Sequence, residues 1–74
     1  MKVYLVIDRE KPFGDWHIQQ GHAIKSRAIE YMAILARGHN LDQDDDCCKF
    51  VQTSPERWEN DHQYLAIEEI FIVE

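Results

Sequence analysis

The segment at residues 2–7 is the feature that most restricts the fold of this chain. Its β-branched and aromatic side chains favour a strand. In such a strand Val3, Leu5 and Ile7 fall on one side, whereas Tyr4 and Val6 fall on the other. Because both sides are apolar, we expect this strand to lie in the interior of a sheet.

A helix is predicted at residues 26–37, where alanine, leucine, methionine and glutamate favour helix. Ser26 is a suitable N-cap residue, and Gly38 is the type of residue that follows the last helical turn. Ile34 falls on the charged side of this helix and is expected to be exposed. The side chains expected to pack against the sheet are those of Ala28, Met32, Leu35 and Ala36.

The remaining segments are expected to be extended chain and turns. Residues 9–15 contain proline and glycine, which predicts a turn joining 2–7 to a second strand at 16–24, with a bulge or bend at Gly21. Together the two strands are expected to form a hairpin.

The second half is expected to supply a short strand at 49–53 and the final strand at 64–73. The Ser-Pro-Glu sequence that opens residues 54–60 is typical of a helix N-terminus, so a single helical turn is predicted there. The adjacent glutamates at 68–69 interrupt the alternation of the final strand, which predicts a bulge or an edge position.

These patterns predict an α+β fold: a three- or four-stranded, mostly antiparallel sheet with one helix packed on a face, in the order ββαβ or ββαββ. The 74 residues suffice for a single domain spanning 1–74. The sequence shows no export signal, and none of its apolar runs approaches the ~20 residues that a membrane-spanning helix needs. We therefore expect a cytoplasmic protein with reduced cysteines.

Charge is divided unequally along the chain. Residues 1–40 hold six Lys or Arg against four acidic residues, whereas residues 41–74 hold two against ten. The halves thus carry net charges of +2 and −8, in agreement with the total of −6 at pH 7. A strongly acidic surface repels nucleic acid and anionic membranes and attracts basic protein surfaces. We therefore expect a basic protein as partner and no direct contact with nucleic acid or membrane.

The acidic second half is the leading candidate for a functional surface. An exposed aromatic ringed by charge is typical of a binding hot spot. Trp58 lies in a hydrophilic segment and fits that description if it is exposed, whereas otherwise it fills the edge of the core. Ile34 would mark either a partner surface or a homodimer contact. The residues predicted to bind a partner are Asp42, Asp44, Asp45, Asp46, Glu56, Trp58, Glu59, Asp61 and Ile34.

No pattern typical of an enzyme is found. Both serines occupy expected capping positions, which leaves a Ser-His-Asp arrangement without a nucleophile, and there is no glycine-rich phosphate loop. The acidic run that starts at Asp42 is similar to a calcium loop, but its sixth position is Cys47 instead of glycine and its twelfth is Thr53 instead of glutamate. We therefore expect no catalytic residue, no cofactor and no metal.

The alternative is a small metal- or thiol-dependent enzyme or sensor that uses Cys47, Cys48, His39 and His62. Spacing opposes it, because structural zinc sites separate paired cysteines by two to four residues. Charge opposes it too, because the aspartates before Cys47 disfavour a thiolate and raise the pKa of the thiol. The cysteines are therefore expected to be free and dispensable, and metal analysis would distinguish the two hypotheses.

Three segments carry a resemblance: MKVYLV at 1–6, AIKSRAIEY at 23–31 and IEEIFIV at 67–73. In these segments the chain resembles a family of very short bacterial and phage proteins. The resemblance implies a ββαβ core and a phage or mobile-element setting, and it carries no site residues over. Small acidic proteins of that setting often inhibit host nucleic-acid machinery, as anti-CRISPR proteins do, so an inhibitor of a basic host protein is the expectation.

Overall fold

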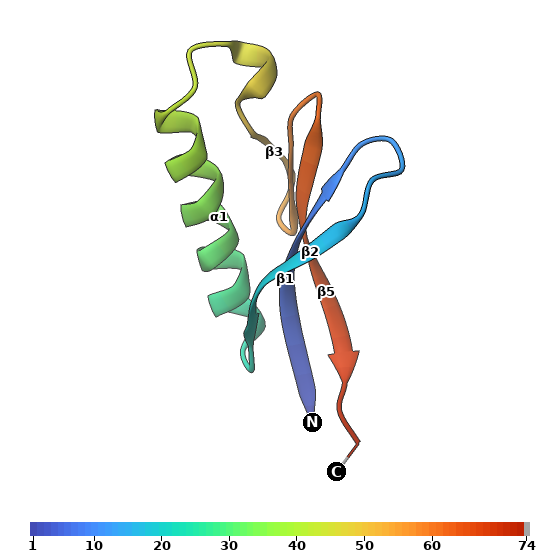
Figure 1. Ribbon diagram of the computed structural model, residues 1–74. Coiled ribbons are helices and arrows are strands. Elements are labelled where there is room, and N and C mark those ends of the chain that lie inside the picture. Colours follow the sequence, from blue (N-terminus) through green and yellow to red (C-terminus); the bar gives the residue numbers. More distant parts are fainter. Residues whose placement is uncertain (74) are drawn as a thin grey trace.

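The computed structural model describes residues 1–73. Five strands form one antiparallel sheet in the order β2-β1-β5-β4-β3, and a single α-helix packs across one face (Figure 1). The predicted α+β class is confirmed, with five strands instead of three or four. The elements are β1 (Lys2–Glu10), β2 (Trp16–His22), α1 (Lys25–Leu41), the 3₁₀ turn η1 (Asp46–Cys48), β3 (Val51–Ser54), β4 (Arg57–Glu59) and β5 (Gln63–Phe71).

The apolar first segment lies where its sequence predicts, inside the sheet. β1 pairs with β2 on one side, as the expected hairpin, and along its whole length with β5 on the other. Val6 is fully buried and faces α1, whose stripe of Ala28, Met32 and Ala36 is also fully buried. Leu35 is only partly buried beside them. Burial of this shared stripe holds the two layers together.

Both predicted ends of the helix are wrong. Ile24 is the N-cap and Ser26 already lies in the first turn, while the helix continues through Gly38 to Leu41. The extension has a tertiary cause, because the last turn contacts the following loop. The Asn40 side chain donates to the Phe50 carbonyl oxygen and accepts from its amide, over 2.9 and 2.6 Å. Ile34 is 63% exposed, as expected.

The helical turn predicted at 54–60 does not form. Those residues make the turn and second strand of the β3–β4 hairpin. The Ser54 hydroxyl accepts a hydrogen bond from the Glu56 amide at 3.2 Å, so it stabilises the tight turn instead of capping a helix. A serine before proline is equally suited to either role, which explains the error.

Two expected irregularities are also resolved. The bulge of the β1–β2 ladder lies opposite the Val6–Ile7 step and not at Gly21. Glu68 and Glu69 pair in register with Leu5 and Tyr4, without a bulge. Because β4 reaches only as far as Ala66, the other side of β5 is an open edge at these glutamates, as one of the two alternatives predicted. Within residues 1–73 no helix is long and apolar enough to cross a membrane.

Candidate functional site

The loop that follows α1 carries the run of exposed aspartates. Asp42, Asp44, Asp45 and Asp46 are all exposed there, and η1 turns the chain back towards the sheet. Asp61 joins them from the β4–β5 connection, because its amide donates to the Cys47 carbonyl oxygen at 3.2 Å. We call these five aspartates the acidic end.

The acidic end is poor in compensating cations. Its one ion pair within residues 1–73 joins Asp46 to Lys49 at 3.7 Å, and the Asp46 side chain remains fully exposed. Asp42, Asp44, Asp45 and Asp61 form no ion pair in this part of the chain. Negative charge is therefore concentrated where the loop meets solvent.

Two other predicted carboxylates lie away from this end and are neutralised. Glu56 pairs with Lys25, and this contact raises the pKa of the lysine. Glu59 pairs with Lys11 at 2.8 Å and with Arg57 at 3.0 Å. These contacts, the lysine first, lower the pKa of Glu59 to about 2. Both glutamates are thus paired within the fold, whereas four of the five aspartates of the acidic end form no ion pair within residues 1–73.

The Glu59 contacts predict a pH-dependent contribution to stability. In Glu59→Gln we expect the free energy of unfolding at pH 7 to fall by about 1 kcal/mol, because partly exposed pairs contribute little individually. The wild-type advantage should be complete above the ordinary glutamate pKa and disappear as pH falls towards 2. Urea unfolding from pH 7 to 2 measures it. Glu30→Gln, an exposed helix position without an ion pair in residues 1–73, is the control, and equal losses in both variants would contradict the assignment.

Trp58 does not belong to the surface. Its side chain is 8% exposed and lies in the core cluster, on the face of β4 that meets the helix. The guanidinium carbon of Arg37 lies 5.9 Å from the indole centroid. The hypothesis of an exposed aromatic anchor is therefore wrong, and the core alternative is correct. The sequence context was misleading because side chains alternate along β4, so the hydrophilic neighbours of Trp58 point away from α1 while the indole points towards it.

An apolar residue that the sequence did not single out lies beside the acidic end. Leu41, the last residue of α1, is 87% exposed and directly precedes Asp42. Ile34 is one heptad earlier, so both side chains lie on the same outer face of the helix. Leu41 was missed because Gly38 was expected to end the helix. The exposed apolar pair Ile34 and Leu41 takes the place of Trp58 as candidate anchor.

The structure brings together three of the four residues of the metal or thiol alternative. A sulfur or nitrogen atom from each of Cys47, Cys48 and His62 lies within 4.8 Å of the others. The pKa of the Cys47 thiol is raised, first by its contact with Cys48 and further by Asp45 and Asp61. This direction agrees with the sequence argument against a reactive thiolate. His39 is separate, since its Nε2 donates to the Cys48 carbonyl oxygen at 3.0 Å.

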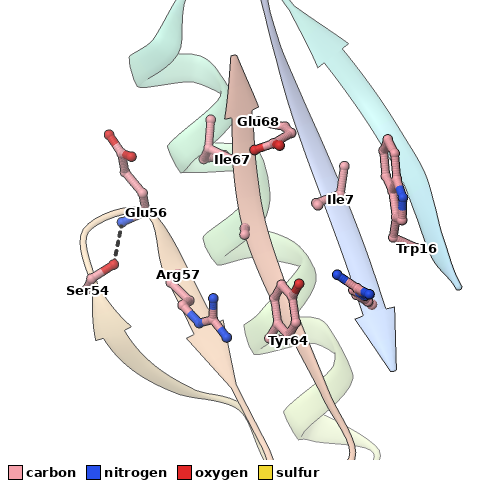
Figure 2. Close-up of a pocket in the computed structure, with 10 residues that line it drawn as sticks. Ile7, Trp16, Ser54, Glu56, Arg57, Tyr64, Ile67 and Glu68 are labelled. Atoms are coloured by element: carbon pink, nitrogen blue, oxygen red, sulfur yellow. Dashed lines mark hydrogen bonds between the residues drawn. The ribbon is translucent and has the colours of Figure 1, made fainter. Parts of the chain in front are cut away.

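The sheet face that points away from α1 carries an open groove of about 450 Å³. Figure 2 shows the side chains that line it. The guanidinium of Arg57 lies 4.0 Å from the Tyr64 ring centroid, and Arg9 donates to the Gly14 carbonyl oxygen at 3.1 Å. The alternation of β1 and β5 would have revealed this second face. Because Glu56 and Glu68 also line the groove, its charge favours no class of ligand.

Comparison with known proteins gives no matching family model, no similar curated protein and no similar solved structure. The functional argument therefore depends on the chain's own geometry.

Proposed function

We propose that this chain is a non-enzymatic protein-binding module that engages a Lys/Arg-rich protein surface through its acidic end. The observation that supports this most is the position of exposed Leu41 directly beside Asp42 and the other unpaired aspartates. Apolar contact and negative charge thus meet at one end of the molecule.

The two components have different roles. Exposed charges are worth about 0–1 kcal/mol each, so the aspartates act chiefly by accelerating encounter with a basic surface. Leu41 and Ile34 supply exposed apolar surface that would be buried in the interface, and this burial slows dissociation. The outer face of α1 and the loop after it therefore form the proposed interface.

The partner class follows from the charge. Lys/Arg-rich channels that bind phosphate backbones are the basic protein surfaces most complementary to a run of carboxylates. We therefore favour an inhibitor that occupies the nucleic-acid site of a host protein, in keeping with a phage or mobile-element setting. The net charge of −6 supports this form of the proposal.

The test is an association-rate measurement on the partner captured from extracts of the native host. Asp44, Asp45 and Asp46 are changed together to asparagine, which keeps their shape and removes three charges. We expect association at low salt to slow by about tenfold and its salt dependence to flatten. Stability should hold, because these side chains are exposed.

The matched control removes three charges elsewhere, as Glu10→Gln, Asp15→Asn and Glu30→Gln together. All three positions are exposed and lie outside the acidic end. If control and test variants associate at the same rate with the same salt response, net charge alone acts and the acidic end is not the interface.

A further inference from the structure

We propose that Cys47, Cys48 and His62 form a binding site for a thiolate-preferring divalent cation, with Zn²⁺ as the ion that fits best. This inference concerns a different chemistry from the partner-binding proposal, although Asp45 and Asp61 of the acidic end lie near the same residues. It reverses the expectation that these cysteines bind no metal.

The two sulfurs already have the separation that a metal requires. The adjacent positions of the two cysteines opposed a zinc site in the sequence, but η1 places their Sγ atoms 3.6 Å apart. In a tetrahedral site with Zn–S bonds of about 2.3 Å, two sulfurs lie about 3.8 Å apart. The 3₁₀ turn therefore holds the two sulfurs at a separation that suits binding of one metal ion by both.

His62 comes from the β4–β5 connection, 15 positions after Cys47 and 14 after Cys48, and supplies a third ligand atom within 4.8 Å of both sulfurs. Its side chain is exposed, so the imidazole has room to change rotamer and approach the two sulfurs. Two thiolates and one imidazole nitrogen are a donor set that Zn²⁺ accepts, with the fourth position left to water. On binding, the two thiols would release their protons to solvent.

Buried Asn60 fixes the two segments relative to one another. Its Nδ2 donates to the Cys48 carbonyl oxygen at 2.9 Å, while its Oδ1 accepts from the amide of His62 at 2.8 Å. His39 holds the same Cys48 carbonyl from the end of α1. Asn60 is only 9% exposed, so these bonds are partly shielded from water. The ligand-bearing loops are thus preorganised, and a metal would not have to order them.

The surrounding charge also favours a cation. Asp45 and Asp61 lie close enough to the Cys47 thiol to act on it electrostatically. The same negative potential that disfavours a free thiolate attracts a divalent ion, whose own charge then dominates the site. The charge of the bound ion, and not the free thiols, would then stabilise the two thiolates.

Co²⁺ titration of the reduced, metal-free chain tests the site. We expect one Co²⁺ per chain, a sulfur-to-cobalt charge-transfer band in the near ultraviolet, visible bands of tetrahedral intensity, and displacement by Zn²⁺. Cys47→Ser, Cys48→Ser and His62→Ala should each weaken Co²⁺ binding by at least about tenfold. Each serine variant should also lose about half of the charge-transfer intensity, because one of two sulfurs is removed.

His17→Ala is the control, since His17 is exposed on β2 and lies outside the cluster. Its Co²⁺ affinity and spectrum should equal those of the wild type. Circular dichroism checks that each variant is folded, and the exposed positions Cys47 and His62 carry the test if the half-buried Cys48 does not tolerate serine. Wild-type binding without a charge-transfer band, or unchanged affinity in Cys47→Ser and His62→Ala, would overturn the proposal.

Discussion

Replacing Trp58 with alanine is expected to lower the free energy of unfolding by about 3–5 kcal/mol, the largest single effect that the structure predicts. The indole fills the space between β4 and α1, and alanine would leave a cavity that the short strand cannot close. Domains of this size have little stability in reserve, so the variant should be partly unfolded at 37 °C. Urea unfolding followed by circular dichroism measures the loss.

Trp58→Phe separates packing from hydrogen bonding. The indole N–H is buried and has no hydrogen-bond partner within residues 1–73. Phenylalanine keeps most of the apolar volume and removes this unsatisfied donor, so we expect less than half of the alanine loss. Equal losses in the two variants would show that the indole N–H stabilises the fold, contrary to its lack of a hydrogen-bond partner within residues 1–73.

Asn60→Ala is expected to lower the free energy of unfolding by about 2–3 kcal/mol. The Asn60 side chain satisfies the Cys48 carbonyl and the amides of His62 and Gln63, and alanine would leave all three backbone groups without that partner. The loss is bounded because part of this region can reach water. Urea unfolding at neutral pH provides the value.

Gln52→Ala is the matched control for Asn60, since it removes an amide from an exposed position on β3. Its effect should remain within about 0.5 kcal/mol. Similar losses in Asn60→Ala and Gln52→Ala would show that the Asn60 hydrogen bonds contribute nothing to stability.

Local pattern was sufficient for much of the fold. The alternation of Val3 to Ile7 and the stripe of Ala28, Met32 and Ala36 each repeat at the period of their element, so strand and helix were predictable without a partner. The helix end was not, because it depends on bonds between Asn40 and Phe50, ten positions away. A helix end that is stabilised by a later loop leaves no local signal.

In the candidate site, too, some features follow from the local sequence and others depend on tertiary contacts. Exposure of the aspartates followed from their own polarity, but the pairing of Glu59 with Lys11 depends on strand order. The convergence of Cys47, Cys48 and His62 depends on η1 and on the buried Asn60. Composition gave the sign of the surface charge, whereas only topology decides which charges remain free.

The central position of β1 and β5 has a consequence for how the molecule is made. The Met1 ammonium donates to the Ile72 carbonyl oxygen across 71 positions, so the middle of the sheet joins distant segments (Figure 1). Such pairing requires closure of a very long loop before its contacts stabilise it, which slows folding. During synthesis β1, apolar on both faces, must therefore wait for β5 to leave the ribosome. In that interval β1 can pair only with β2, so the nascent hairpin presents an open edge of an apolar strand, the kind of segment that chaperones bind and that otherwise aggregates.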